Sequence, residues 1–389
     1  MSERLRVLFI ARWYPVRMDS MLGLFVVRHA LAVKNYAHVN VINAAADINL
    51  NNSTYETEVN TIEGIESIIV YFKKSNYSFI NFYRNVNSYF KAYNHYKAKN
   101  GQPHICHVHV LSRTAVLALY LKLIYHIPYL ITEHWSRYLP RNVKKGSYKG
   151  FFRKLFTKIA VSGAFGVTTV TENLKSSMQV LGLKNKYFVV PNAVDTDKFA
   201  LTEKINQDEK IILHVSCFEE VSKNIKGLIN STEQLLKQRS DFELWLVGDG
   251  IDKKMIENYV ASKNISQGKI KFKGLLEGAE LAKVMRNATF QVLFSNYESQ
   301  PSVIIESFAS GVPFVATAVG GIPEIIDERR GILVEPGNES QLTEAMNTML
   351  DNYSKFDTNE LQNYVGNKFS LKVVGKQFYD LYLKMISAR

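Results

Sequence analysis

The densest set of residues that could do chemistry lies between residues 295 and 317. Glu298 follows an apolar run that predicts a strand, and Glu306 falls within a helix predicted to begin near Ser302. The first turn of that helix would present the backbone N–H groups of Ser302 and Val303, with the positive end of the helix dipole, to a phosphate. A carboxylate only accepts hydrogen bonds, so Glu306 suits paired sugar hydroxyls.

A simpler interpretation of the two acids needs no ligand. It makes Glu298 a solvated loop acid and Glu306 a surface residue of the helix. The apolar neighbours Ile304, Ile305 and Phe308 argue against full exposure of Glu306.

A lysine and two glycines follow other predicted strands of the same half. Lys223 comes after the strand predicted at 210–215, where a lysine could cap a diphosphate as a point charge. Most lysines are simply exposed, so its position after a strand is what gives Lys223 weight. Gly320 and Gly321 would allow close backbone approach to a ligand.

Strands and helices alternate along the chain and must position these residues. The predicted strands lie at 6–10, 39–43, 67–71, 104–109, 129–132, 165–170, 210–215, 242–248, 270–273, 290–294, 313–316 and 332–334. Helical patterns lie between them, with Ser112 and Thr171 as predicted caps. This alternation predicts two doubly wound α/β domains with parallel sheets, and ligands beyond the carboxyl ends of the strands, in a cleft between the domains.

Composition narrows the class of protein. The chain has 389 residues, of which 46% are apolar and 22% charged, which is typical of packed domains and excludes disordered and fibrous classes. Two cysteines, Cys106 and Cys217, cannot form a disulfide framework and favour a reducing compartment. The apolar runs at 7–11 and 114–131 predict neither a signal peptide nor a membrane span.

The net charge of +12 is concentrated in one part of the chain. Residues 67–171 contain one acid, Glu133, against sixteen lysines and arginines, so nucleic acid, phosphorylated ligands and anionic membranes all remain open as partners. Within this block, residues 137–158 hold eight bases and no acid, interleaved with aromatic residues. A basic amphipathic helix there would suit an anionic membrane surface, and a core-facing apolar stripe with a solvated basic face explains the pattern equally well.

In their order along the chain, these motifs resemble the retaining, nucleotide-sugar-dependent glycosyltransferases of family 4. Glu298 and Glu306 match that family's pair of glutamates, and the resemblance continues through segments 189–195, 247–250, 311–317 and 320–326. Segments 13–15, 23–26 and 131–135 are similar to a branch that builds bacterial surface polysaccharides.

The resemblance implies the GT-B fold and a division of labour between domains. Residues 1–188 would form an acceptor-side Rossmann-like domain and residues 189–370 a nucleotide-sugar-binding one. Residues 371–389 would form a helix that packs back on the first domain.

The resemblance also implies roles for individual residues of the second half. Glu306 would hold the ribose hydroxyls, and Lys223 with the amides of Ser302 and Val303 would neutralise charge on the departing diphosphate. Glu298 would orient the hydroxyls of the donor sugar. No metal and no cofactor beyond the nucleotide sugar would be needed, and no His/Cys/Asp spacing resembles a zinc site.

In the first half, Gly23 would let its loop approach the donor phosphates, and His134 would face the donor sugar and the acceptor. His107 and His109 are weaker candidates. The chain departs from the family pattern in two places, with Gly23 alone where two glycines are usual and Cys217 where an arginine is common. Lys226, Arg12, Arg17 and Arg113 are alternatives for the missing charge.

The predicted function is transfer of a sugar from a UDP- or GDP-linked donor to a hydroxyl of a glycan or lipid-linked acceptor, in capsule or lipopolysaccharide synthesis. The expected location is cytoplasmic, peripheral on the inner face of the cell membrane. One rival is a nucleic-acid-binding protein using the basic block, although no recognition motif supports it, and we expect no nucleic-acid partner. Another rival is a nucleotide-sugar epimerase on the same fold.

Overall fold

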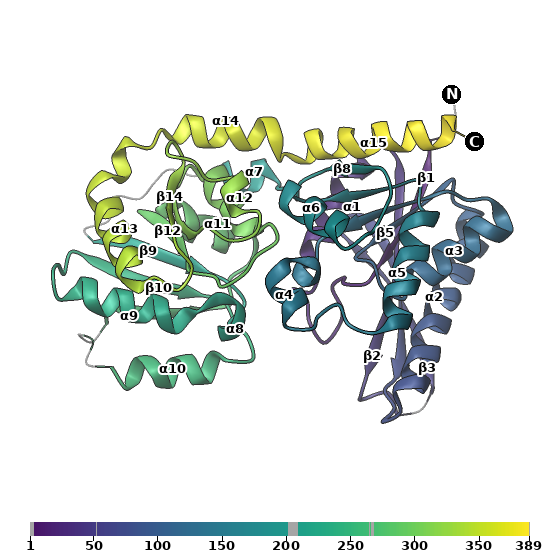
Figure 1. The fold of residues 1–389 in the computed structure, drawn as a ribbon, viewed down its shortest axis with the longest axis horizontal. Helices are drawn as coiled ribbons and strands as arrows, with labels where there is room; N and C mark the ends of the chain where they lie inside the picture. Colours follow the sequence, from purple (N-terminus) through teal and green to yellow (C-terminus); the bar gives the residue numbers. More distant parts are fainter. Residues whose placement is uncertain (1–3, 52, 201–208, 264, 266–267, 389) are drawn as a thin grey trace. The chain divides into compact units, whose positions relative to one another are not determined.

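Figure 1 shows the computed structural model of the chain, which describes residues 4–51, 53–200, 209–263, 265 and 268–388. The chain divides into two compact units. Unit 1 is Met1–Ala193 with Leu371–Arg389, and unit 2 is Val194–Ser370. Each unit is an α/β layer structure built on a parallel sheet, which confirms the predicted fold class.

The sheet of unit 1 has the strand order β3-β4-β2-β1-β5-β6-β7-β8. Every neighbouring pair is parallel except β3 and β4, which are antiparallel. The strands are β1 (Arg6–Ala11), β2 (His38–Asp47), β3 (Tyr55–Ile62), β4 (Ile65–Lys73), β5 (Ile105–His109), β6 (Tyr129–Glu133), β7 (Gly166–Thr169) and β8 (Tyr187–Val189).

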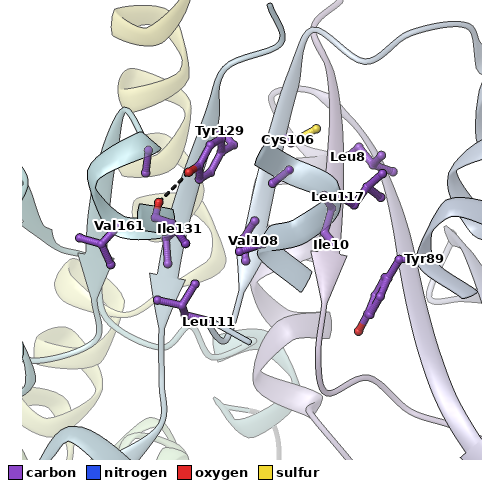
Figure 2. Packing of buried hydrophobic residues seen from close by; sticks show 14 of the residues in the cluster. Leu8, Ile10, Tyr89, Cys106, Val108, Leu111, Leu117, Tyr129, Ile131 and Val161 are labelled. Atoms are coloured by element: carbon purple, nitrogen blue, oxygen red, sulfur yellow. Dashed lines mark hydrogen bonds between the residues drawn. The ribbon is translucent and has the colours of Figure 1, made fainter. Parts of the chain in front are cut away.

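Helices cover both faces of this sheet because successive strand residues point to opposite sides. Leu8 and Ile10 belong to a core closed by α2, α3, α5 and α6, part of which Figure 2 shows, while Val7 and Phe9 belong to a core closed by α1 and α15. Tyr129 is buried in the first core and donates to a backbone carbonyl of α5. The helices are α1 (Leu24–Lys34), α2 (Ser78–Asn100), α3 (Thr114–Tyr125), α4 (Pro140–Lys144), α5 (Phe151–Gly163), α6 (Glu172–Val180) and α15 (Leu371–Ser387).

The sheet of unit 2 is parallel throughout, in the order β11-β10-β9-β12-β13-β14. Its strands are β9 (Lys210–Val215), β10 (Phe242–Val247), β11 (Ile270–Gly274), β12 (Phe290–Leu293), β13 (Phe314–Thr317) and β14 (Gly331–Val334). The helices are α7 (Thr196–Ala200), α8 (Glu220–Lys223), α9 (Ile225–Leu236), α10 (Lys253–Ala261), α11 (Gly278–Asn287), α12 (Ser302–Ala309), α13 (Glu339–Asn352) and α14 (Thr358–Lys368). Ile211 and Leu213 pack with α11, α12 and α14 on one face, and Ile212 packs with α9 and α13 on the other.

Each sheet reverses its winding direction once. In unit 1 the reversal falls between β1 and β5, and in unit 2 between β9 and β12. The loops that leave the two strands of such a pair diverge to opposite faces, which is where open α/β sheets bind ligands. In both units this point lies beside the residues that the sequence singled out.

Three local predictions were wrong. Strand β3 was not predicted, because its run Tyr55–Ile62 is rich in acidic and amide side chains and pairs only at the lateral edge of the sheet. The short strand β8, which pairs with β7 at the opposite lateral edge, was not predicted either. Ser112 is not the cap of α3, which starts after Arg113 without a side-chain cap. The predicted cap of α6 is confirmed, since Thr171 accepts from the backbone N–H of Leu174 at 3.2 Å.

Most of the apolar stripe of α5 faces outward rather than into the core. Phe152 is 83% exposed and Leu155 is also exposed, as is Ile159 one turn further on, so the core-facing interpretation is wrong at these positions. Phe156 is half-buried and packs against the core. None of the described helices is both long enough and apolar enough to cross a bilayer.

Helix α15 packs on α1 at a contact that leaves no room for a side chain. A Cβ on Gly375 would lie 2.1 Å from the carbonyl oxygen of Ala32. We therefore expect Gly375→Ala to lower the free energy of unfolding by about 1–3 kcal/mol, as over-packing does.

Gly366→Ala in α14 is the matched control, because a Cβ there meets nothing within 4 Å. Helix propensity alone predicts that it is neutral or stabilises by up to about 1 kcal/mol. Urea unfolding of both variants measures the difference, and equal effects would contradict the packing argument.

Candidate functional site

Two loops at the reversal point of unit 2 bring Lys223 and Glu298 together. Lys223 ends α8, which follows β9, and Glu298 lies in the loop between β12 and α12. The Nζ of Lys223 lies 2.5 Å from the Oε1 of Glu298. The hydroxyl of Ser295 donates to the same carboxylate oxygen at 2.8 Å. These contacts bring together, beyond the carboxyl ends of two neighbouring strands, residues that are far apart in the sequence.

This ion pair is largely shielded from water. The side chains of Lys223 and Glu298 are 14% and 11% exposed, which excludes a solvated loop acid at position 298. Burial acts to lower the pKa of Lys223, but Glu298, with smaller contributions from Cys217 and Glu219, outweighs it, and the pKa is raised. Lys223 therefore stays cationic at neutral pH.

Helix α12 begins next to this pair in sequence and carries Glu306. Pro301 occupies the N-cap position, and Ser302 and Val303, both half-buried, form the first turn, whose N–H groups lack intrahelical acceptors. Glu306 lies one turn further along and is buried, 5% exposed. The prediction that Glu306 is not a surface residue is confirmed.

Glycines hold both loops in place. A Cβ on Gly320 would lie 1.8 Å from the carbonyl oxygen of Glu298, and the N–H of Gly321 donates to the carbonyl of Ser299 at 3.0 Å. Gly248 likewise lies against the carbonyl of Ser216, in the loop after β9. These glycines permit close packing of loop on loop, and this packing accounts for Gly320, where close approach to a ligand was predicted.

Lys223 and Lys226 are the two candidates in unit 2 for the missing charge, and they differ in position. Cys217, which stands where the family often has arginine, is exposed and lies close enough to Lys223 and Glu298 to interact electrostatically with both. Lys226 is directed elsewhere, with its Nζ 5.1 Å from the ring centre of Tyr259. Lys223 is thus the cation that the structure pairs with Glu298.

In unit 1, His134 follows β6 and lies in a buried setting. Its Nδ1 lies 3.2 Å from the Oδ1 of Asn192, and its ring packs on Phe25 with centroids 4.3 Å apart. Burial holds its pKa well below the usual range, so the imidazole is neutral. The preceding residue, Glu133, accepts from three backbone N–H groups, and burial raises its pKa to about 7.

Three further histidines surround His134. His29, His107 and His109 are all fully buried, and their rings lie within contact distance of one another or of His134. His107 and His109 were predicted only as weaker candidates, and His29 was not predicted, although its spacing from Phe25 on one helix face is a usable signal.

This cluster is also the group that comes closest to a metal site among the described residues. One ring nitrogen each from His29, His109 and His134 lie within 4.8 Å of one another. Burial keeps all three neutral, which is the ligating form. No acid belongs to the group, so the charge of a bound divalent cation would be uncompensated in an apolar surrounding.

Gly23 caps the start of α1 with a φ of 72°. A Cβ at this position would lie 2.4 Å from the backbone of Trp13, so contact between two loops already accounts for the glycine.

Comparisons with known proteins define the class. The model of Glycosyltransferase Family 4 matches residues 51–198, and the model of glycosyl transferases group 1 matches residues 195–368. The chain belongs to the family 4 glycosyltransferases.

One relative is an uncharacterized glycosyltransferase of Methanocaldococcus jannaschii, 30% identical over 64% of this chain and 66% of its own length. Sucrose-phosphate synthase from Thermosynechococcus elongatus has a similar structure, with a TM-score of 0.79, 19% identity and full coverage, 100%, of both chains. HepE of Anabaena in complex with UDP gives a TM-score of 0.74 at 15% identity, covering 99% of this chain and 100% of that one. These two structures share the GT-B fold with this chain.

A double-mutant cycle tests the buried pair. We expect Lys223→Met and Glu298→Gln each to lower the free energy of unfolding by about 3 kcal/mol, because each leaves a partner charge buried without compensation. The double variant should lose clearly less than the sum of the two.

The exposed pair of Lys253 and Asp249, at 3.3 Å, serves as the control. Its variants Lys253→Met and Asp249→Asn should each leave the stability nearly unchanged, because an exposed ion pair is screened by water and salt. Strict additivity in the Lys223–Glu298 cycle, measured by urea unfolding, would contradict the coupling.

Proposed function

We propose that the protein is a retaining glycosyltransferase that moves a sugar from a UDP- or GDP-linked donor to a hydroxyl of a glycan or lipid-linked acceptor in cell-surface polysaccharide synthesis. The observation that carries the proposal is the shielded pair of Lys223 and Glu298, followed by α12 with its free first-turn amides and buried Glu306. Family membership and the UDP-bound structure of HepE support it.

In this proposal the pair is preorganised for a diphosphate and its sugar. An ammonium group has three N–H donors, and the bond to Glu298 uses one, which leaves two for phosphate oxygens. Because Glu298 keeps Lys223 cationic inside a shielded site, the lysine would stabilise charge on the departing diphosphate without reorganising. The amides of Ser302 and Val303 would add the helix dipole.

The two carboxylates divide the sugar hydroxyls between them. Glu306, one turn inside α12, would accept from the ribose hydroxyls, and Glu298 would accept from hydroxyls of the donor sugar. From unit 1, the family resemblance assigns His134 to the sugar and acceptor and Gly23 to the donor phosphates. The acceptor hydroxyl would attack from the face of the leaving group, which retains the anomeric configuration. The proposal needs no metal, because lysine and helix amides meet the charge.

We further propose that the amino-terminal parts of α2 and α5 contact a membrane surface. Phe79 and Phe82 on α2 and Phe151 and Phe152 on α5 are exposed, and bases interleave with them along α5. Exposed aromatic residues flanked by lysines suit the headgroup region of an anionic membrane. Such docking would place the enzyme near a lipid-linked acceptor.

Nucleotide binding tests the donor site. We expect Glu306→Gln to weaken the binding of UDP or GDP about tenfold to a hundredfold, because the loss of a charged acceptor costs about 1.5–3 kcal/mol. Glu344→Gln on the exposed face of α13 is the matched control and should leave affinity unchanged. Isothermal titration with each nucleotide measures the difference, and equal affinity in all three proteins would contradict the site.

Two controls separate the proposal from its rivals. Free nucleoside diphosphate should be released from the sugar nucleotide only when an acceptor is added, whereas an epimerase converts the sugar without an acceptor. Salt-sensitive binding of random oligonucleotides, without any nucleotide-sugar binding, would favour the nucleic-acid alternative.

Vesicle sedimentation tests the membrane contact. We expect binding to vesicles with anionic lipid to exceed binding to neutral ones. Phe152→Ser should reduce this binding severalfold, because it removes apolar area that the membrane would bury. Val180→Ser, at an equally exposed position on α6, is the control. Equal binding to both kinds of vesicle, or to neither, would remove the membrane from the proposal.

A further inference from the structure

Three arginines follow neighbouring strands at or beside the reversal point of the unit 1 sheet. Arg12 directly follows β1, Arg113 follows β5, and Arg137 follows β6. The guanidinium carbons of Arg12 and Arg137 lie 4.6 and 4.0 Å from the ring centre of Trp135. Arg113 lies over Phe82 at 5.3 Å. This is the position at which an open α/β sheet binds a ligand.

No acid among the described residues is in direct contact with these arginines. Within the described part of the chain, none of the three guanidinium groups forms an ion pair, and the one hydrogen bond from them is Arg137 to the carbonyl of Ser147 at 3.3 Å. Other arginines of the same protein are paired, as Arg17 is with Asp47. A cluster of unpaired arginines is therefore unusual in this chain.

The neighbouring acid cannot fill the role. Glu133 is the one acid of residues 67–171, and its carboxylate accepts from the backbone N–H groups of Leu111, His134 and Trp135. Those bonds commit both of its oxygens to the loop that it stabilises. Glu133 attracts Arg12 and Arg137 electrostatically but forms no ion pair with either.

Arg137 gives a second, independent sign of a ligand. Its side chain is buried, 8% exposed, and its Nε has no hydrogen-bond partner. A buried N–H without an acceptor costs free energy, so such a group is normally satisfied by protein, water or a ligand. Burial, together with the charges of Arg137 and Arg113, lowers the pKa of Arg12 in spite of the opposing effects of Tyr89 and Glu133, and a bound anion would stabilise its charged form.

We infer that Arg12, Arg113 and Arg137 form a binding site for a phosphate or carboxylate oxyanion carried by the acceptor substrate. This inference rests on the proposed transferase function. Guanidinium groups bind such oxyanions in a bidentate manner. The rings of Trp13 and Trp135, 5.1 Å apart in an edge-to-face contact, supply an apolar surface for a sugar beside the charge.

Phosphate titration tests the site directly. Inorganic phosphate and pyrophosphate are titrated into the full chain in the presence of saturating UDP or GDP, so that the donor site is occupied. We expect Arg12→Gln and Arg113→Gln each to weaken binding about tenfold, with Lys184→Gln, an exposed lysine of unit 1, unchanged as the charge-matched control. Arg113 is half-buried, which keeps the test independent of whether an Arg137 variant folds.

Several results would overturn the inference. Equal phosphate binding in all variants would overturn it. Complete displacement of phosphate by the nucleotide would also overturn it, because phosphate would then bind in the donor site. Nucleotide affinity is measured in the same series. If UDP and GDP fail to bind, the proposed function fails while the phosphate comparison between variants still stands.

A vesicle arm distinguishes the source of the oxyanion. Sedimentation with vesicles containing anionic lipid is repeated for Arg12→Gln and Arg113→Gln. Unchanged vesicle binding, with weakened phosphate binding and a raised KM for acceptor but not donor, supports an acceptor group. Parallel loss of vesicle and phosphate binding with unchanged KM would assign the site to lipid headgroups and overturn the acceptor assignment.

Discussion

The reversal of winding in each parallel sheet is the constraint on which the candidate sites depend. The loops that follow β9 and β12 leave toward opposite faces of the sheet. Side chains from both loops therefore remain beyond the carboxyl ends of these two strands, where they can meet. Lys223 and Glu298 are separated by 75 residues, yet this geometry brings their charged atoms to 2.5 Å. The same topology in unit 1 places Arg12 and Arg113 after neighbouring strands.

The two reversal points carry opposite electrostatic arrangements. In unit 2 the cation is compensated, because Glu298 pairs with Lys223 and Ser295 orients the carboxylate. That arrangement keeps the unliganded site stable and the lysine charged. In unit 1 the arginines lie among aromatic rings and form no ion pair within the described residues, and Arg137 retains an unused N–H. An uncompensated cluster gains more from an incoming anion than a compensated one, since no protein contact must be given up.

The sequence predicted what depends on local pattern. Buried parallel strands read as apolar runs, so β9 was predicted with its observed bounds, Lys210–Val215. Strand β3 alternates polar residues at a sheet edge and carries no such signal. Glu298 and Glu306 stood out by motif, but the contact of Glu298 with Lys223 could not be derived, because it depends on strand order rather than on spacing.

Long-range packing accounts for the other features that sequence reasoning missed. His29 and His109 come from a helix and a strand far apart in the chain, and Asn192 reaches His134 from beyond the last strand of unit 1. For the arginines, by contrast, the composition alone indicated an excess of unpaired positive charge. A block with sixteen bases and the single acid Glu133 must leave charges unpaired somewhere.

What the structure adds is where those unpaired charges matter most. Lysines on the outer face of α5 are screened by water and salt, and their interactions fade over about 8–10 Å at physiological ionic strength. Arg137 is buried and Arg12 half-buried, so an ion held between them would feel a lower effective dielectric and a stronger attraction. The excess positive charge of unit 1 therefore acts over two distances. The exposed lysines attract anionic surfaces at long range, and the arginines beyond the carboxyl ends of the strands can bind a single oxyanion at short range.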